Sequence, residues 1–272
     1  MEPQPSRIRL GTQGWNYDAW VGPFFPPATR ASDFLTTYAR AFDTVEVDAT
    51  FYGIPSPKTV RGWASRVGAR FEFALKLPQE ISHEQRFVHA ESTLHAFVDR
   101  VRELGSKLGP ILIQCGPDFS PIERDVLAAF LEHIPRDVQF AIEFRQPSWI
   151  TRGTLALLKE HQVALALSDG KWIPREWLLK LCAQPTADFS YVRWMGPDRS
   201  IVDYSHVQVD RSAELNAWAT MIPELLAQVR TVYGFANNHF AGHAPQSARM
   251  LQERLGVPTV DPRSLGEQAT LF

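Results

Sequence analysis

AIEFRQPSW (residues 141–149) combines the pattern of a buried β-strand with two charged side chains. The apolar residues Ile142 and Phe144 lie at alternate positions, and Glu143 and Arg145 lie between and after them. In a barrel, successive strand residues alternate between the interior and the surrounding helix layer. We therefore expect the two apolar side chains to face helices and the two charged side chains to point into a barrel.

Eight apolar segments rich in Val, Ile, Leu and Phe recur along the chain and predict strands. They span residues 7–13, 44–51, 70–77, 109–115, 139–145, 163–169, 189–195 and 231–238. Apolar residues between them have helical spacing, so each intervening segment presents one apolar stripe. The predicted helices cover residues 35–42, 60–67, 94–104, 121–134, 151–161, 174–183, 213–230 and 245–255.

Regular alternation of strands and helices predicts parallel strands joined by right-handed crossovers. Eight such units in 272 residues predict an α/β fold, a (β/α)8 TIM-type barrel with an outer helix ring. The alternative, an open doubly wound sheet, usually carries a G-x-G-x-x-G loop after its first strand. The loop here, GTQGW (11–15), lacks that spacing. We expect a single domain over residues 1–272 with a short polar extension at 1–6.

The bulk composition narrows the function classes. A net charge of −2 and a pI of about 6.5 do not favour a broad nucleic-acid or membrane surface, although they leave room for a local basic groove. Cys115 and Cys182 lack the spacing of a disulfide framework or a zinc ribbon. The polar N-terminus has no apolar signal segment, and no apolar run reaches membrane-spanning length. These features predict a cytoplasmic protein that does not enter membranes.

Polar residues fall near the carboxyl ends of the predicted strands, where barrel enzymes place their chemistry. The candidate catalytic residues are Glu46, Glu143, Asp169 and His239. The candidate ligand-binding residues are Trp15, Asp48, Tyr52, Lys76, Gln114, Arg145, Arg193, Asn237 and Asn238. These groups could instead form a structural salt-bridge network that fills the barrel. Because a buried ion pair is often no more stabilising than a well-packed apolar pair, so many ionic groups favour a polar ligand site.

The charges divide into two sets. Lys76, Arg145 and Arg193 suit an anionic or carbonyl-bearing ligand, since arginine makes bidentate contacts. The carboxylates are candidate acids or bases, metal ligands, or partners that orient an arginine. A divalent metal therefore stays an open alternative, with no H-E-x-x-H motif to support it.

Histidines and aromatic residues add further candidates. His83, His239 and His243 are general bases or ligands, or else ordinary loop and capping residues. The aromatic residues expected near the mouth either pack in the core or form stacking walls for a sugar or base. They are Trp15, Tyr17, Trp20, Phe51, Tyr52, Trp149 and Trp194.

Several separated motifs resemble the YecE-like family, a domain of unknown function. The matching segments are GTQGWNYDAWVGPFFP (11–26), TVEVDATFY (44–52), KLPQEISHEQRF (76–87), GPILIQCGPDF (109–119), AIEFRQPSW (141–149), YVRWMG (191–196) and FANNHFAGHAPQSA (235–248). The resemblance covers almost the whole chain in order. It implies a TIM barrel with a pocket at the carboxyl ends of the strands and no established activity. It also suggests, by analogy, a relation to metal-dependent barrel endonucleases and sugar isomerases.

Three hypotheses for function follow. The first is an enzyme, such as a hydrolase, lyase or isomerase, that acts on a small anionic ligand such as a phosphorylated or carboxylated sugar. The second is a metal-dependent nuclease or nucleic-acid-binding protein, in which carboxylates bind the metal and the aromatic rim stacks bases. The third is a small-molecule binding protein without turnover. The substrate, the reaction and the oligomeric state are not determined by this sequence.

Overall fold

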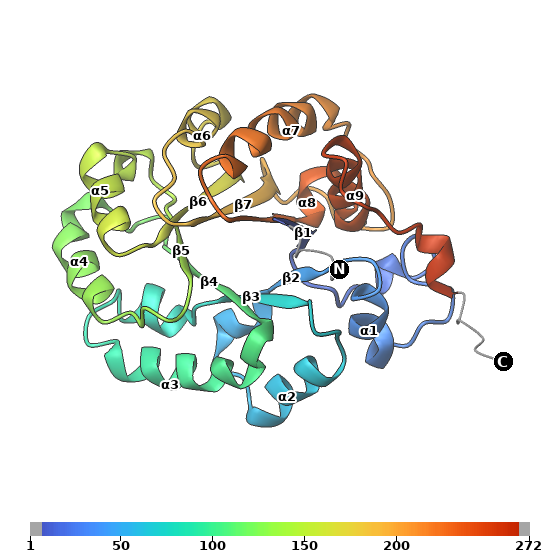
Figure 1. Cartoon of the computed structure of the whole chain (residues 1–272), viewed down its shortest axis with the longest axis horizontal. Helices are drawn as coiled ribbons and strands as arrows, with labels where there is room; N and C mark the ends of the chain where they lie inside the picture. Colours follow the sequence, from blue (N-terminus) through green and yellow to red (C-terminus); the bar gives the residue numbers. More distant parts are fainter. Residues whose placement is uncertain (1–6, 267–272) are drawn as a thin grey trace.

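The computed structural model describes residues 7–266, whose eight strands form one parallel sheet curled into a barrel and ringed by helices (Figure 1). The strands are β1 Ile8–Thr12, β2 Thr44–Val47, β3 Glu72–Lys76, β4 Leu108–Gln114, β5 Phe140–Glu143, β6 Ala164–Gly170, β7 Phe189–Gly196 and β8 Thr231–Ala236. Their order is β1-β8-β7-β6-β5-β4-β3-β2. The predicted (β/α)8 barrel is confirmed.

Helices follow the strands along the chain and cover the outside of the barrel (Figure 1). They are α1 Phe34–Tyr38, α2 Pro57–Ser65, α3 Glu91–Val101, α4 Arg124–Glu132, α5 Arg152–Glu160, α6 Arg175–Leu181, α7 Ser212–Leu226, α8 Asn238–Ala241 and α9 Ala244–Arg254. Three begin at capping side chains: Ser56 and Thr151 accept hydrogen bonds from backbone N–H groups three residues later, and Asn237 accepts one from the backbone N–H of His239. Among residues 7–266, no helix is both long and apolar enough to cross a bilayer.

The barrel interior is a small apolar cluster separated from the outer core. Small residues such as Ala141 and Ala166 pack there with larger ones such as Tyr191 and Phe235. The alternate positions, including Ile142 and Phe144, belong to the large core between the sheet and the helices. The predicted alternation of the strand at residues 141–145 therefore places its side chains as expected.

Neighbouring strands elsewhere in the barrel are joined by ladders of residue pairs, but β1 and β2 are not. One bridge between Gln13 and Glu46 joins these strands at the mouth end. Below it, the hydroxyl of Tyr38 (α1) accepts from Thr12 N at 2.9 Å and donates to the Thr44 carbonyl oxygen at 3.1 Å. This side chain therefore substitutes for a direct ladder bond between the two strands.

Three predicted strands end at least two residues earlier than expected. The predicted strand 44–51 ends at Val47, because Asp48–Tyr52 forms a 3-10 turn. The predicted strand 139–145 ends at Glu143, and 231–238 ends at Ala236. Polar residues at strand ends therefore sit on the first loop positions, where their side chains reach the mouth. The predicted extension at 1–6 lies outside the described residues.

Candidate functional site

The centre of the barrel mouth holds a salt bridge that crosses from β7 to β2. Arg193 donates to both oxygens of Glu46, from Nε at 2.9 Å and from Nη2 at 2.7 Å. Its Nη1 donates to Glu143 Oε2 on β5. All three nitrogens of this buried guanidinium are thus used within the protein. Arg193 links two carboxylates and is not a free anion-binding group.

Glu143 is surrounded by donors. Ser168 donates to its Oε2 at 2.5 Å, and Arg145 Nε donates to its Oε1 at 3.2 Å. Burial raises the pKa of Glu143, but the charges of Arg193 and Arg145 and the serine hydrogen bond outweigh it and lower the pKa to about 2. Glu143 therefore stays ionised at neutral pH and positions two arginines.

Glu46 is fully buried on the opposite side of the barrel. Besides the two bonds from Arg193, its Oε2 accepts from the Tyr191 hydroxyl at 2.7 Å. Burial raises the pKa of Glu46 above its usual value, and the charge of Arg193 offsets only part of that effect. Its donors come entirely from the protein, so Glu46 anchors Arg193.

A cavity of about 490 Å³ opens at the mouth beside this network. Its volume lies within the roughly 300–1,000 Å³ typical of small-molecule sites. We call it the mouth cavity. Its lining residues are Glu143, Arg145, Lys171, Trp172, Met195, Gly196, Pro197, Asp198, Arg199, Asn237 and His239.

Arg145 differs from Arg193 in what its guanidinium contacts. Its Nε binds Glu143, and its Cζ lies 5.5 Å from the ring centroid of Trp172. Its two terminal nitrogens make no hydrogen bond to residues 7–266. The side chain is 18% exposed and lines the mouth cavity. Arg145 therefore presents a pair of unused donors to whatever occupies the cavity.

The remaining charges of the mouth cavity are mainly positive. Lys171 and Arg199 line it and form no ion pair within the described part of the chain. The acids that line it are Glu143 and Asp198, and Glu143 is already bound by two arginines. Since three cations face two acids, the cavity carries a surplus of positive charge.

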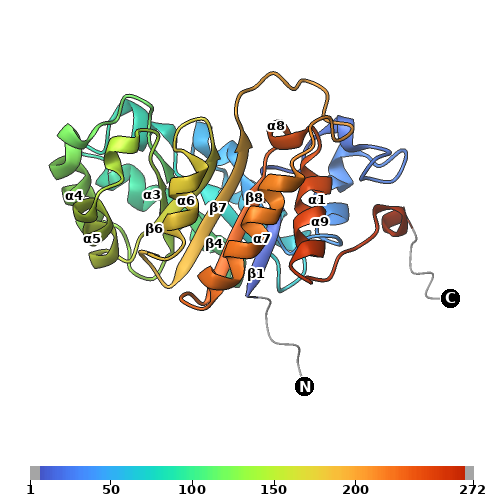
Figure 2. The ribbon, with the colours of Figure 1, turned by 90° about the horizontal axis from the view of Figure 1, so that it is seen from above.

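His239 supplies the titratable base of the mouth cavity. Its Nε2 lies 3.3 Å from the hydroxyl of Tyr204, which belongs to the long β7–α7 connection, residues 197–211, standing above the strand ends in Figure 2. Burial, followed by the charge of Arg199, lowers the pKa of His239 below its usual 6.5. The imidazole is therefore mainly neutral at pH 7 and able to accept a proton.

Asn237 is oriented by two residues that sequence reasoning did not select. Its Nδ2 donates to Gln13 Oε1 at 2.7 Å, and Gln13 Nε2 donates to Met195 Sδ at 2.9 Å. Ser168 and Tyr191, which bind the two buried glutamates, were also missed. A period-two count from Ala164 or from Arg193 would have marked both as interior positions.

Lys76 and Asp48 form a separate pair beside the mouth cavity. Their Nζ and Oδ1 atoms are 3.2 Å apart, and the ammonium lies 4.4 Å from the ring centroid of Phe51. Gln114 is buried, and its side-chain amide makes no hydrogen bond to residues 7–266. Tyr52 is 78% exposed on the outer surface. None of these residues lines the mouth cavity.

Three further candidate residues, Asp169, Trp15 and Asn238, do not line the mouth cavity either. Asp169 points into the helix layer, where its Oδ2 accepts from Arg175 Nε at 2.6 Å and Trp218 Nε1 at 2.7 Å. The reason is that β6 turns Ala166 and Ser168 inward, so the next residue faces outward.

Trp15 packs edge-on against Trp63 and Phe73 in the outer core, with ring centroids 6.1 and 6.4 Å away. Asn238 is buried at the start of α8, where its Oδ1 accepts from Trp20 Nε1 and Ala244 N. Both residues therefore support loops at the mouth end without lining the cavity.

The other two candidate histidines do not line the mouth cavity. His83 Nδ1 lies 2.9 Å from Ser82 Oγ, and burial with the charges of Arg145 and Lys76 lowers its pKa. His243 lies at the cap of α9, outside the mouth cavity.

Within residues 7–266, no group of three or more His, Cys, Asp or Glu side chains has the arrangement of a metal site. Of the carboxylates considered as metal ligands, Glu46, Glu143 and Asp169 are instead bound by arginines, and Asp48 is paired with Lys76.

Comparison with known proteins identifies relatives along most of the chain. The family model described as "Protein of unknown function DUF72" matches residues 9–269. UPF0759 protein YunF of Bacillus subtilis is 26% identical, over 92% of this chain and 95% of that protein. UPF0759 protein YecE of Escherichia coli is 29% identical over 146 residues, and the chain spans about half of its length, 51%.

Solved structures with this fold include two described as DUF72 family proteins. The protein from Thermotoga maritima has a TM-score of 0.77 and 23% identity, over 92% of this chain and 100% of that one. The protein from Enterococcus faecalis has a TM-score of 0.73 and 23% identity, over 92% and 98% of the two chains. At this identity the likeness supports the barrel fold.

Proposed function

We infer that this chain, which belongs to the DUF72 family of proteins of unknown function, binds a small anionic ligand in its mouth cavity and acts on it as an enzyme. The observation that carries the proposal is the guanidinium of Arg145. It lies at the carboxyl ends of the strands with two unused terminal nitrogens facing a cavity. Paired N–H groups of this kind match a carboxylate or a phosphate.

The electrostatics of the mouth cavity favour an anion over a cation. The ionised carboxylate of Glu143 is neutralised by Arg193 and Arg145, so it does not attract a second positive group. Lys171 and Arg199 then add two positive charges at the rim, against the single negative charge of Asp198. A ligand carrying one or two negative charges would remove this surplus.

The neutral groups of the mouth cavity suit a polyhydroxylated ligand. Asn237 and His239 can exchange hydrogen bonds with hydroxyl groups, and the ring of Trp172 offers an apolar face. These features together support a sugar that bears a phosphate or carboxylate group.

The proposed catalytic base is His239. It lines the mouth cavity, and its lowered pKa keeps it mainly unprotonated at pH 7. Tyr204, 3.3 Å from Nε2, would orient the ring. Glu143 and Glu46 would act as positioning residues, because their oxygens are occupied by Arg193, Arg145, Ser168 and Tyr191. This shifts the proton-transfer role from the glutamates to the histidine.

The proposal is tested by calorimetry of the purified protein with a panel of sugar phosphates and sugar acids. Arg145→Gln should weaken binding of any hit by roughly 10- to 100-fold, as expected for hydrogen bonds of about 1.5–3 kcal/mol to a charged group. Arg152→Gln, an exposed arginine on α5, is the matched control and should leave affinity unchanged. Absence of binding across the panel, or equal affinity in both variants, would overturn the proposal.

Turnover is followed by NMR of the bound ligand over time. His239→Gln should abolish conversion while leaving affinity within a few-fold of the unsubstituted protein. Binding without conversion would favour the alternative of a non-catalytic binding protein. The nuclease hypothesis is not carried forward, since its carboxylates form no metal-ligand group among residues 7–266.

A further inference from the structure

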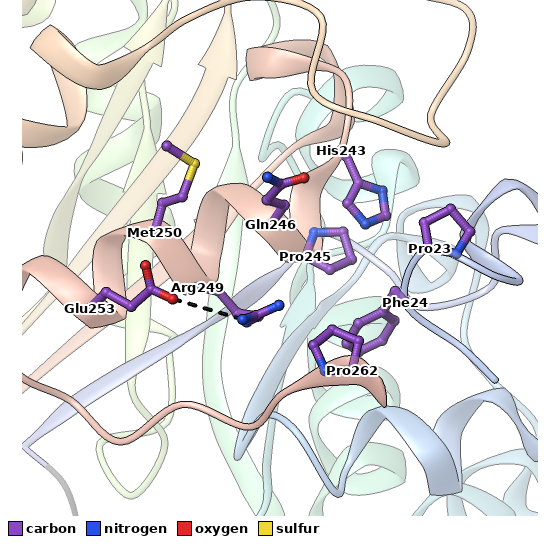
Figure 3. Close-up of a pocket in the computed structure, with 9 residues that line it drawn as sticks. All are labelled: Pro23, Phe24, His243, Pro245, Gln246, Arg249, Met250, Glu253 and Pro262. Atoms are coloured by element: carbon purple, nitrogen blue, oxygen red, sulfur yellow. Dashed lines mark ion pairs between the residues drawn. The ribbon is translucent and has the colours of Figure 1, made fainter. Parts of the chain in front are cut away.

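A second cavity lies outside the barrel, beside α9. Its volume is about 150 Å³, and α9, the loop after β1 and the C-terminal segment enclose it (Figure 3). Its apolar wall includes Phe24, Pro245 and Pro262, and its polar wall includes His243, Gln246 and Arg249. A cavity of this volume holds about six non-hydrogen atoms, the size of benzene.

Arg249 has no hydrogen bond to any residue in 7–266, and its Nε is completely buried. Its one ion pair among the described residues is with Glu253, with Nη2 and Oε1 3.8 Å apart, which is too far for a hydrogen bond (Figure 3). Asp261 also interacts electrostatically with Arg249, but that carboxylate is paired with Arg263 at 3.0 Å. Buried polar atoms in folded proteins are nearly always paired. The guanidinium of Arg249 therefore has N–H donors that a bound ligand could use.

His243 brings an acceptor to the same cavity. The side chain is 3% exposed, and its Nδ1 lies 2.8 Å from the carbonyl oxygen of Tyr204. A carbonyl only accepts, so Nδ1 carries the proton. Burial lowers the pKa of His243, which leaves Nε2 as an unprotonated acceptor. No residue in the described part of the chain donates to Nε2.

The charges distinguish between two classes of small ligand. Arg249 and Glu253 balance each other, so the cavity has no net charge to attract a simple anion. A ligand for this cavity needs an acceptor for the N–H groups of Arg249 and a donor for His243 Nε2, and a carboxylate is the acceptor that a guanidinium binds in bidentate fashion. A zwitterion meets both needs and adds no net charge.

We propose that this cavity binds a small α-amino acid of about alanine size. The carboxylate lies on the guanidinium of Arg249, the ammonium group donates to Nε2 of His243, and the short side chain packs against Phe24 and Pro262. The site lies on the helix ring and does not depend on the mouth cavity or on the activity proposed for it.

The test is calorimetric titration of the full-length protein with alanine, lactate and methylamine. Alanine should bind saturably, lactate several-fold more weakly, and methylamine not at all. Arg249→Gln should weaken alanine binding at least tenfold, while Arg66→Gln, an exposed arginine at the end of α2, and Arg145→Gln should not change it.

Glu253→Gln provides a second measurement, at a half-exposed residue on the surface of α9. It makes the cavity net positive, so the preference should shift from alanine toward lactate. Loss of alanine binding in Arg145→Gln, unchanged binding in Arg249→Gln, or no saturable alanine binding would each overturn the proposal.

Discussion

The two ends of the barrel hold similar arrangements of charge with different surroundings. At the mouth, Arg193 joins Glu46 and Glu143, and the Tyr191 hydroxyl binds one of the two acids.

At the opposite end, Arg9 joins Asp43 and Glu72, with distances of 3.2 and 2.8 Å, and the Tyr233 hydroxyl binds Glu72 at 2.6 Å. An arginine between two acids with a tyrosine partner is therefore not by itself a mark of a ligand site.

The difference lies in unused donors and in hydration. At the lower end, Arg9 also binds the carbonyl of Arg70, and the neighbouring Arg7 donates to three backbone carbonyls. At the mouth, Arg145 keeps two terminal nitrogens unused. The mouth acids are also fully buried, while the side chains of Asp43 and Glu72 are 39% and 20% exposed. The lower network is complete, and the mouth network has donors left for a ligand.

The largest effect should come from removing the central arginine at each end. Arg193→Met leaves two buried carboxylates without their main partner and should cost roughly 3–5 kcal/mol of unfolding free energy. Arg9→Met should cost less, about 1–2 kcal/mol, because water can reach Asp43 and Glu72. Urea unfolding at neutral pH measures both. Equal losses would show that the two networks are equivalent and would remove the contrast drawn above.

The pH dependence of stability should have opposite signs at the two ends. The pKa of Glu143 is held at about 2, below its usual 4.5, so its contribution is complete above pH 4.5 and is lost as the pH falls toward 2. The expected size is on the order of 3 kcal/mol. Asp43 is only partly exposed, and this partial burial, incompletely offset by the charge of Arg9, raises its pKa to about 6. Its contribution is present below pH 3.8 and is lost as the pH rises through about 6.

Unfolding curves of Glu143→Gln and Asp43→Asn between pH 3 and pH 8 separate these contributions. Glu143→Gln should flatten the loss of stability at acidic pH, and Asp43→Asn should remove the decline between pH 3.8 and 6. An unchanged acid limb in Glu143→Gln would mean that its carboxylate is not held ionised by the arginines.

The tyrosines provide a finer comparison. Tyr191→Phe removes a hydrogen bond to a buried charged oxygen and should cost about 1.5–3 kcal/mol, while Tyr233→Phe removes one to the partly exposed Glu72 and should cost about 0.5–1.5 kcal/mol. Thermal unfolding of the two variants ranks them. The reverse ranking would indicate that burial of the acid does not set the strength of these bonds.

The smallest effect on the mouth should come from Asp169→Asn. This change weakens the bonds to Arg175 and Trp218 in the helix layer and should reduce stability by about 1–2 kcal/mol. It should leave ligand affinity at the mouth unchanged. A loss of affinity would place Asp169 in the site again, contrary to its outward orientation.

The sequence was sufficient for the fold because the periodic patterns are local. Alternation along 141–145 and the apolar stripes between strands reflect two fixed geometries, the pleat of a strand and the pitch of a helix. The same alternation placed Glu143 correctly, because Ile142 and Phe144 define which face is apolar.

Local periodicity did not predict side-chain direction correctly where two adjacent polar residues are both buried. In β6, Ser168 and Asp169 are both polar residues at a strand end, and both are buried. Which of the two points into the barrel and which points toward the helices depends on how β6 is oriented in the closed barrel. Trp15 and Asn238 were misplaced for a similar reason, since their surroundings come from Trp63 and Trp20 on other segments.

By itself, therefore, the sequence determined the barrel, the interior parity of most strands and the concentration of polar groups at their carboxyl ends. Only the tertiary structure decided which charged side chains are paired within the protein and which keep donors for a ligand. Arg193 and Glu46 are 147 positions apart, and their pairing is a consequence of barrel closure. Arg145 is left with unused donors because Arg193 and Ser168 occupy Oε2 of Glu143, and Oε1 accepts from Arg145 Nε alone. That outcome depends on distances between distant segments, which no local pattern contains.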